Sequence, residues 1–115
     1  MTEFMFLYSG GDPEWMNASE EEKKAAMEKW GAWMANLQAK DQLSTGGSPL
    51  HYTGKRLSSD GVVTDLAAAE LKEMVTGYSI VRAKDYDEAV EIAKTCPIFQ
   101  YPGSIVEVRE VPQMG

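Results

Sequence analysis

Runs of apolar residues predict three β-strands, at residues 3–9, 74–83 and 104–111. The first run, EFMFLYS, is apolar on both faces of the expected strand. Phe4, Phe6 and Tyr8 lie on one face, and Met5 and Leu7 lie on the other. A strand that is apolar on both faces is typically covered on both sides of its sheet. A chain of this length has helices for only one side, so we expect a second copy of the protein to cover the other.

A helix over residues 19–40 is indicated by its cap and by its apolar spacing. Ser19 and Glu22 have the S-x-x-E spacing of a capping box, in which two orphan amide donors are satisfied reciprocally. Apolar residues then recur at i, i+3, i+7 and i+10, on one helical face: Met27, Trp30, Met34 and Leu37. This face should pack against the sheet, and the helix should end near Lys40.

A second helix is predicted between the last two strands. Asp85 and Glu88 have the D-x-x-E spacing of another capping box, and Pro97 should end the helix. Its expected buried stripe consists of Tyr86, Ala89, Val90, Ala93 and Cys96. Strand, helix and strand together form a β-α-β unit over residues 74–111.

The middle of the chain is rich in turn residues. Residues 43–49 (LSTGGSP) are expected to be a connector, and residues 50–57 a strand that Gly54 weakens. The sequence SSDG at 58–61 is a turn signal, after which residues 62–64 can return as the second arm of a hairpin. Residues 65–73 favour a short helical turn on propensity alone.

The order β-α-β, hairpin, β-α-β is that of the split-βαβ or ferredoxin-like plan. This plan is an α+β fold, an antiparallel sheet with two helices on one face. We expect one domain over residues 1–115, paired through the helix-free sheet face into a dimeric α+β barrel. Glu107 and Arg109 share a strand face and should form a structural ion pair at or near that interface.

Composition narrows the range of partners. Of the 115 residues 43% are hydrophobic and 25% charged, as in ordinary globular proteins, and the net charge is -7. Nucleic-acid affinity depends largely on Lys and Arg neutralising phosphates, and anionic membranes attract basic segments. We therefore expect neither nucleic acid nor membrane as a partner.

Cysteine usage and hydropathy bear on location. Cys96 is the only cysteine, so an intramolecular disulfide or a thiolate zinc cluster is excluded. The opening FMFLY is too short for a signal sequence, and no apolar stretch reaches the ~20 residues of a membrane span. We expect a cytoplasmic protein with no cofactor and no metal.

A series of different short motifs follows in order along nearly the whole chain. They are Tyr8-Ser9-Gly10-Gly11-Asp12 with Trp15, Val63-Thr64-Asp65, Ala69-Glu70-Leu71-Lys72-Glu73, Gly77-Tyr78-Ser79-Ile80, Asp85-Tyr86-Asp87-Glu88-Ala89, Cys96-Pro97 and Gly103-Ser104-Ile105-Val106-Glu107-Val108-Arg109. As an ordered set they resemble the YCII-related superfamily, specifically its DGPF-domain branch. The name-giving motif is degraded, because Asp65-Leu66-Ala67-Ala68 stands where that branch has D-G-P-F.

The resemblance implies a dimeric α+β barrel with a cleft between sheet and helices. In the wider YCII family a histidine and an aspartate are proposed as a catalytic pair, but the family histidine lies near the first helix. This chain has only His51, on the expected middle strand. Members of the DGPF branch are bacterial and often linked with alternative sigma factors, without an established activity. The resemblance therefore implies the fold and leaves the chemistry open.

His51 and Asp65 are the candidate catalytic residues. Histidine is the one side-chain type that ordinarily changes charge near neutral pH, so His51 could act as a general base beside Asp65. The alternatives are an exposed or hydrogen-bonded strand histidine and an aspartate that caps a helix. The sequence alone leaves both interpretations open.

Candidate ligand-binding residues are Tyr8, Asp12, Trp15 and Tyr78. Aromatic rings can stack on a flat ligand, although aromatic residues at helical or strand spacing more often belong to a core. Two functions remain: a small-molecule enzyme or binding protein that uses the cleft, and a non-catalytic accessory module that acts through a protein partner. The altered D-G-P-F segment favours a protein without demonstrated catalysis.

Overall fold

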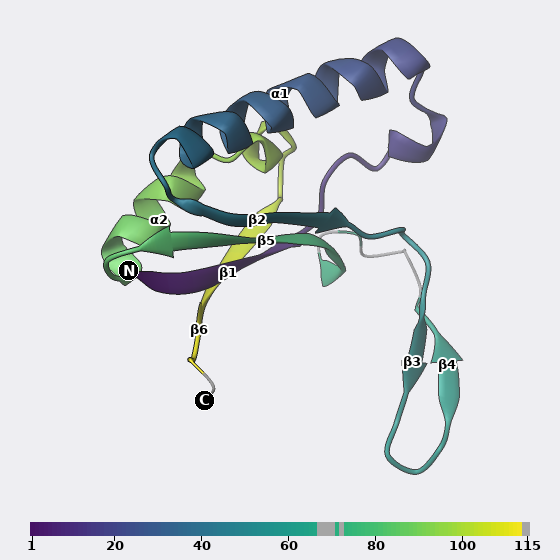
Figure 1. Ribbon diagram of the computed structural model, residues 1–115. Coiled ribbons are helices and arrows are strands. Elements are labelled where there is room, and N and C mark those ends of the chain that lie inside the picture. Colours follow the sequence, from purple (N-terminus) through teal and green to yellow (C-terminus); the bar gives the residue numbers. More distant parts are fainter. Residues whose placement is uncertain (67–70, 72, 114–115) are drawn as a thin grey trace.

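A four-stranded antiparallel sheet carries the two main helices on one face (Figure 1). The computed structural model describes residues 1–66, 71 and 73–113. The elements are β1 (Thr2–Ser9), η1 (Trp15–Asn17), α1 (Glu20–Ala39), β2 (Leu43–Pro49), β3 (Lys55–Leu57), β4 (Val63–Asp65), β5 (Val75–Ala83), α2 (Tyr86–Lys94), η3 (Pro97–Gln100) and β6 (Ile105–Val111). The sheet order is β2-β5-β1-β6, the ferredoxin-like order, which confirms the predicted fold class.

Strand β1 lies at the centre and divides its side chains between two environments. Phe4, Phe6 and Tyr8 are buried beneath the helices, whereas Met5 and Leu7 are half-buried on the other face. The neighbouring strands follow the same alternation, because residues paired across strands share a face. The buried core consists of Phe4, Phe6, Tyr8, Trp33, Leu37, Val81, Ala83, Ala89, Ile92, Ala93, Cys96 and Ile98.

Helix α1 begins with the predicted capping box. The Ser19 hydroxyl accepts from the Glu22 amide at 3.1 Å, and the Glu22 carboxylate accepts from the Ser19 amide at 3.4 Å. Trp33 and Leu37 are buried, but Met27 is 67% exposed, so the first member of the predicted stripe is wrong. The N-terminal turns of α1 project beyond the end of the sheet (Figure 1), and Met27 lies in the half of the helix nearer that end.

Helix α2 shows a buried stripe rotated from the predicted one. Ala89, Ala93 and Cys96 are buried as expected, and Ile92 joins them. The remaining two predicted members, Tyr86 and Val90, are 48% and 41% exposed. The spacing i, i+3, i+4, i+7 from residue 89 describes the observed face, which is rotated away from Tyr86 and Val90 and toward Ile92.

The cap of α2 is only half of the predicted box. The Asp85 carboxylate accepts from the Glu88 amide at 2.9 Å, as expected. The Glu88 carboxylate accepts from the Lys84 amide at 3.0 Å instead of from Asp85. The helix ends at Lys94, before Pro97 opens η3, which confirms the proline stop.

The middle of the chain differs most from the prediction. The expected connector at 43–49 is strand β2, whereas only Lys55–Leu57 of the expected strand 50–57 pairs. β2 is an irregular edge strand with two register shifts against β5, and Gly47 permits them with φ +73°. A Cβ at Gly47 would lie 1.8 Å from the Tyr78 carbonyl oxygen, so the close approach requires glycine. In the sequence this glycine indicates a turn, whereas in the structure it lies in a bulged strand.

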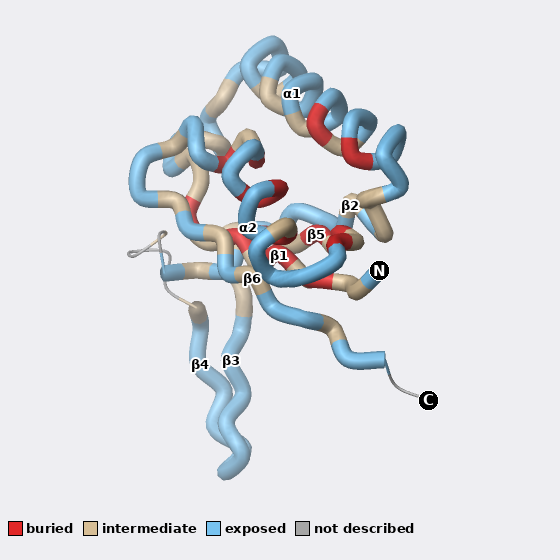
Figure 2. Tube along the Cα trace, turned by 90° about the vertical axis from the view of Figure 1, so that its left-hand side faces the viewer, coloured by how far each residue is buried: buried red, intermediate tan, exposed pale blue. Residues whose placement is uncertain are grey.

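Strands β3 and β4 form the predicted hairpin, paired from Lys55–Asp65 to Leu57–Val63. Its turn is closed by the Asp60 carboxylate, which accepts from the Val62 amide at 3.1 Å. The helical turn expected at 65–73 overlaps β4 at Asp65, and residues 67–70 and 72 lie outside the described residues. The hairpin extends from the sheet as a separate, fully exposed projection (Figure 2).

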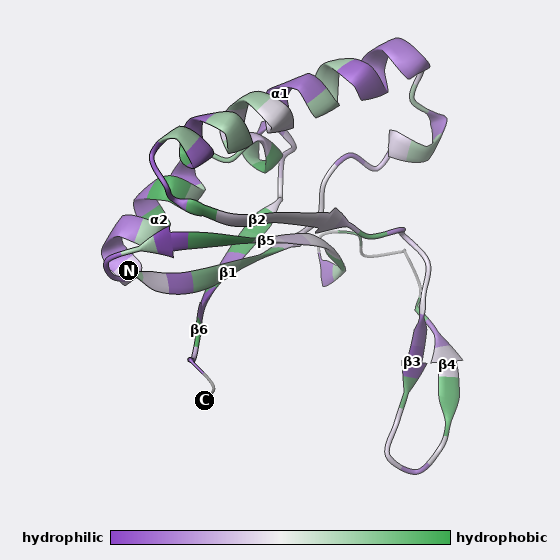
Figure 3. Ribbon diagram, viewed as in Figure 1, coloured by the Kyte–Doolittle hydropathy of each residue, from purple (hydrophilic) through white to green (hydrophobic). Residues whose placement is uncertain are grey.

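The helix-free face has an apolar centre and polar ends. Met5, Leu7, Tyr78 and Ile80 are half-buried neighbours in the β1–β5 register. Along β6, Glu107 and Arg109 form the expected ion pair, at 3.4 Å, but both are more than 60% exposed in a single copy. The middle of β1 is apolar, whereas polar and apolar residues are mixed along β5 and β6 (Figure 3).

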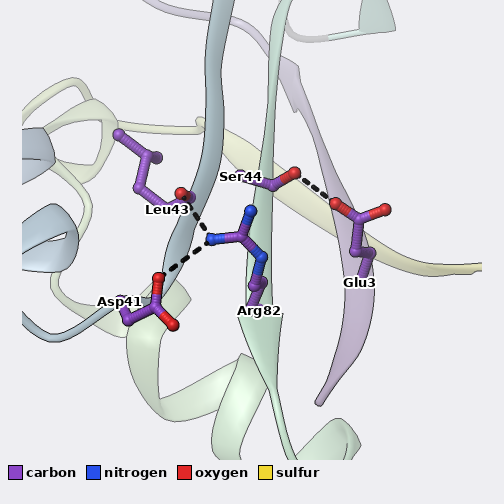
Figure 4. A network of polar contacts seen from close by, with 5 residues as sticks. All are labelled: Glu3, Asp41, Leu43, Ser44 and Arg82. Carbon is purple, nitrogen blue, oxygen red and sulfur yellow. Dashed lines mark hydrogen bonds and ion pairs between the residues drawn. The ribbon is translucent and has the colours of Figure 1, made fainter.

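A polar network holds the far end of this face together (Figure 4). The Arg82 guanidinium donates to the Leu43 carbonyl at 3.0 Å and contacts the Asp41 carboxylate at 3.3 Å. The Ser44 hydroxyl donates to the Glu3 carboxylate, which links β2 with β1 across β5. These contacts tie the start of the irregular edge strand to the centre of the sheet.

We predict that Phe6→Ala will lower the free energy of unfolding by about 3–5 kcal/mol, because it empties a fully buried site beneath both helices. Urea denaturation at fixed protein concentration measures the change. Met27→Ala is the matched control and should change stability by less than about 0.5 kcal/mol, since that side chain is largely exposed. A large loss in the control would contradict the placement of α1.

Candidate functional site: a polar cluster at the strand ends

The loop that follows β1 is organised around the backbone of Asp12. Its carbonyl oxygen accepts from the Trp15 amide and from the Tyr52 hydroxyl, both at 3.1 Å. Its carboxylate accepts from the Glu14 amide at 2.9 Å, an Asx turn. Gly11 has φ +124°, and a Cβ there would lie 3.2 Å from the Tyr52 hydroxyl oxygen. Glycine is therefore needed both for the backbone conformation and for the approach of Tyr52.

Two tyrosines lie close to Asp12. Burial raises the pKa of Tyr52 above its ordinary value, and the negative charges of Asp12 and of ionised Tyr101 raise it further. Burial also raises the pKa of Tyr101, with Asp12 the second cause. Both phenols therefore remain neutral at physiological pH, as hydrogen-bond donors beside a carboxylate.

Ser104 brings the α2–β6 loop to the same place. Ser9 pairs with Ile105, so Ser104 lies beside Gly10 in the continuing register. Its hydroxyl oxygen is buried and has no hydrogen-bond partner among the described residues. On the other side, the Thr76 hydroxyl donates to the Gly10 carbonyl at 2.7 Å. We call Asp12, Tyr52, Tyr101 and Ser104 the strand-end cluster.

Tyr8, one of the predicted ligand-binding residues, belongs to the core. Its hydroxyl donates to Ser79 Oγ at 2.9 Å, and Ser79 donates to the Gly46 carbonyl at 2.9 Å. Its ring meets Trp30 edge-on, with centroids 5.2 Å apart. Burial, and then the neighbouring Cys96, raise the pKa of Tyr8 far above its ordinary value. Tyr8 is therefore a buried core residue, and its hydroxyl is not available at the surface of the protein.

Tyr78 lies on the opposite side of the sheet. Tyr8 pairs with Gly77 and Leu7 with Tyr78 in the β1–β5 register, so the two tyrosines point to opposite faces. The structure therefore does not bring Tyr8 and Tyr78 together in one copy. Of the four predicted ligand residues, Asp12 and Trp15 share the loop after β1; Trp15 is half-buried, with Lys23 Nζ 5.9 Å from its ring.

The predicted catalytic residues are exposed and have separate partners. The His51 ring nitrogen Nδ1 lies 3.0 Å from Thr53 Oγ1, and Asp65 forms an ion pair with Lys55. In the described parts of the chain, no hydrogen bond or ion pair joins His51 to Asp65. His51 does, however, immediately precede Tyr52 of the strand-end cluster.

The buried thiol lies outside the cluster. Burial raises the pKa of Cys96 to about 11, and its side chain is enclosed between α2 and the sheet. A thiol of this kind is a poor nucleophile near neutral pH. Over residues 1–66, 71 and 73–113, no group of three or more His, Cys, Asp or Glu side chains could hold a metal ion.

Sequence reasoning missed Tyr52, Tyr101 and Ser104. The sequence gives Tyr52 no periodic partner, and Tyr101 lies in the turn-rich YPGS segment that opens the last strand. A usable signal exists in the topology: the first and last strands are antiparallel neighbours, so the start of β6 must lie beside the end of β1. Polar residues that flank these two ends are brought together by that pairing.

The fold and the strand-end cluster define a ferredoxin-like α+β protein with a polar site at one end of its sheet. The chain belongs to the YCII-related domain family, whose sequence profile matches residues 12–114. This match confirms the family resemblance and does not bear on the DGPF branch. A search of the curated proteins finds no match to the chain. No helix in the described portion is both long and apolar enough to cross a membrane.

Among solved structures, one similar chain is 5-chloro-2-hydroxyhydroquinone dehydrochlorinase (TftG) from Burkholderia phenoliruptrix AC1100, determined in complex with 2,5-dihydroxybenzoquinone. It is 19% identical in sequence, and the alignment covers 91% of this chain and 90% of that one. The TM-score is 0.42.

We predict that the folded protein will become less stable as the pH rises above about 10, where tyrosines of the unfolded chain ionise. Tyr8, Tyr52 and Tyr101 have raised pKa values when folded, so the native state keeps protons that the unfolded state loses. Absorbance at 295 nm should show these phenols ionising later in native protein than in urea. Overlapping titrations would contradict the burial of the three hydroxyls.

Proposed function

We propose that this protein is a homodimer that binds a small uncharged or cationic organic molecule at the strand-end cluster. The observation that carries the proposal is the Ser104 hydroxyl, which is buried beside the loop of Asp12 and has no hydrogen-bond partner among the described residues. Burying a polar group without a hydrogen bond costs about 1–3 kcal/mol, so native proteins rarely leave a buried polar group without a hydrogen-bond partner. A ligand that hydrogen-bonds Ser104 offsets this cost.

The chemistry of the cluster favours one class of ligand. Tyr52 and Tyr101 offer neutral phenol hydroxyls, Asp12 offers carboxylate oxygens, and Ser104 can donate or accept. The cluster contains no Lys or Arg, and the chain carries a net charge of -7. Anionic ligands are disfavoured by both features, whereas an uncharged or cationic molecule with several polar atoms matches the available donors and acceptors.

The helix-free face supports the dimer. Its centre consists of half-buried Met5, Leu7, Tyr78 and Ile80, so a single copy leaves apolar side chains partly in water. A second copy that packs sheet against sheet removes this area from water, which stabilises the pair. Tyr78 then lies in the seam between the copies, where it can contribute to a ligand cleft only in the dimer.

His51 and Asp65 are proposed as the proton-transfer pair if the bound molecule is chemically changed. Support comes from the position of His51, directly before Tyr52, and from the acid–base range of histidine. Approach of the two side chains requires Asp65 to leave Lys55. A bound molecule released unchanged by wild type, or changed equally fast by His51→Ala, would remove this part of the proposal.

We predict that uncharged or cationic compounds will raise the melting temperature of the wild-type protein in a thermal-shift screen that also contains anionic compounds. Asp12→Asn should abolish the shift, because it removes the carboxylate at the centre of the cluster. Asp41→Asn is the matched control, since that carboxylate is 91% exposed at the opposite end of the sheet. Hits restricted to anions, or hits insensitive to Asp12→Asn, would contradict the proposed site.

We predict a dimer mass for the wild-type protein by light scattering at micromolar concentration. Leu7→Glu should give a folded monomer, because it places a carboxylate in the apolar centre beside the paired residue Glu107. Met27→Glu, on the exposed part of α1, should leave the dimer intact. A monomeric wild-type protein, or a Leu7→Glu variant that stays dimeric, would overturn the proposed interface.

A further inference from the structure

The β3–β4 hairpin is an exposed arm over the residues that the structure describes. The arm, residues 51–66, contains three paired positions and leaves the sheet near the strand-end cluster. Leu57 and Val63 face each other across the hairpin and are 70% and 59% exposed. Val62, beside them, is 53% exposed. The arm thus presents its apolar side chains to solvent.

A projection of this kind is not stable by itself. An isolated two-stranded hairpin is marginal in water, and additional strands or packing are needed to stabilise it. Both long edges of the arm also carry open backbone hydrogen-bonding groups. The radius of gyration, 15.4 Å, exceeds the ~13 Å expected for a compact chain of this length. The arm therefore calls for a covering surface outside its own copy.

The direction of the arm identifies the side on which that surface lies. In two views at right angles, the arm points away from the helices, on the helix-free side of the sheet (Figures 1 and 2). From Tyr52 to Asp60 eight residues at ~3.3 Å each reach about 26 Å, whereas packed sheets lie ~10 Å apart. Even with its turn, an arm of this reach is long enough to extend past a sheet packed at that distance.

The size of the sheet face supports the same conclusion. Four strands at ~4.8 Å spacing and about seven residues in length span roughly 20 by 23 Å, a flat footprint of about 450 Å². Stable interfaces bury about 800 Å² per partner. The side chains that rise from the sheet make the contact area larger than this flat footprint. The sheet face alone nevertheless buries an area at the low end of those found in stable interfaces. A second contact region is therefore needed, and the arm, which lies beside the sheet face, can provide it.

Charge favours the arm as that second region. The chain has a net charge of -7, so two copies repel each other at low ionic strength. The arm is neutral, with Lys55 and Arg56 balanced by Asp60 and Asp65. Lys55 and Asp65 pair with each other on the same side of the hairpin as Leu57 and Val63. While Lys55 and Asp65 remain paired, that side can be buried without leaving an unpaired charge.

We propose that the arm of each copy clasps the second copy of this chain, with Leu57 and Val63 seated against the flank of the partner subunit. This inference rests on the sheet-to-sheet dimer proposed above and adds a reciprocal contact to it. The base of the arm holds Tyr52, whose hydroxyl donates to the Asp12 carbonyl. The clasp therefore restrains a residue of the strand-end cluster, so the order of the site is coupled to the association of two copies.

The test compares two arm variants by sedimentation equilibrium. The double variant Leu57→Ser, Val63→Ser removes the apolar pair and should weaken the dimer at least tenfold, a change of about 1.4 kcal/mol. The matched control Arg56→Ser, Thr64→Ser changes the cross-strand pair on the opposite side of the hairpin and should leave the dissociation constant within about threefold. Circular dichroism verifies the fold of both.

A cross-linking measurement provides a second readout that does not depend on weakening the dimer. Ser59→Cys places a thiol at the turn of the arm for a benzophenone label, while native Cys96 is 4% exposed and protected from it. In an equal mixture of nitrogen-14 and nitrogen-15 protein, cross-links should join light chains to heavy chains. Cross-links confined within one chain would overturn the clasp.

The outcomes separate the two proposals. A dimeric wild type whose dissociation constant is unchanged by Leu57→Ser, Val63→Ser overturns the clasp and leaves the sheet dimer standing. A wild type that is monomeric throughout overturns both. A dimer lost in Leu7→Glu, weakened in the arm variant and cross-linked between copies through Ser59→Cys supports both.

Discussion

The central position of β1, between β5 and β6, is the constraint on which the rest of the structure depends. Its buried face orients Phe4, Phe6 and Tyr8 toward the helices, and its other face carries the half-buried Met5 and Leu7. The first face forms the core of one copy, and the second remains open. Because strand side chains alternate, both faces follow from one heptapeptide. The antiparallel pairing of β1 with β6 also sets Ser104 beside the loop of Asp12.

The overall fold was predictable because its determinants are local. Apolar runs, a capping box at Ser19 and the proline stop at Pro97 each act within a few residues, and together they specify the ferredoxin-like order. The errors occur where tertiary contacts decide. Gly47 reads as a turn residue, but its close approach to Tyr78 allows a bulged edge strand. Met27 has the spacing of a core residue, but its side chain is largely exposed, on a helix whose N-terminal turns project beyond the sheet.

The candidate site was less predictable than the fold. Asp12 and Trp15 are named from the sequence as part of one short motif after the first strand, whereas Tyr52, Tyr101 and Ser104 come from segments far apart in the sequence. Tyr8 was expected at a ligand and is a core residue instead, since its hydroxyl finds Ser79 across the β1–β5 pair. Aromatic residues on a strand identify a face of the sheet, but they do not reveal which polar groups lack partners.

The strand-end cluster and the arm connect folding with association. Tyr52 lies at the base of the arm and hydrogen-bonds the loop of Asp12, so any force that positions the arm also positions a donor in the cluster. An isolated hairpin supplies little such force, because few of its groups are buried. Contact with a second copy positions the arm by burying its apolar side chains. Repulsion between two copies of net charge -7 opposes this contact, and the repulsion weakens as ionic strength rises. Salt should therefore strengthen both dimerisation and the order of the site, which distinguishes apolar association from association through complementary charges.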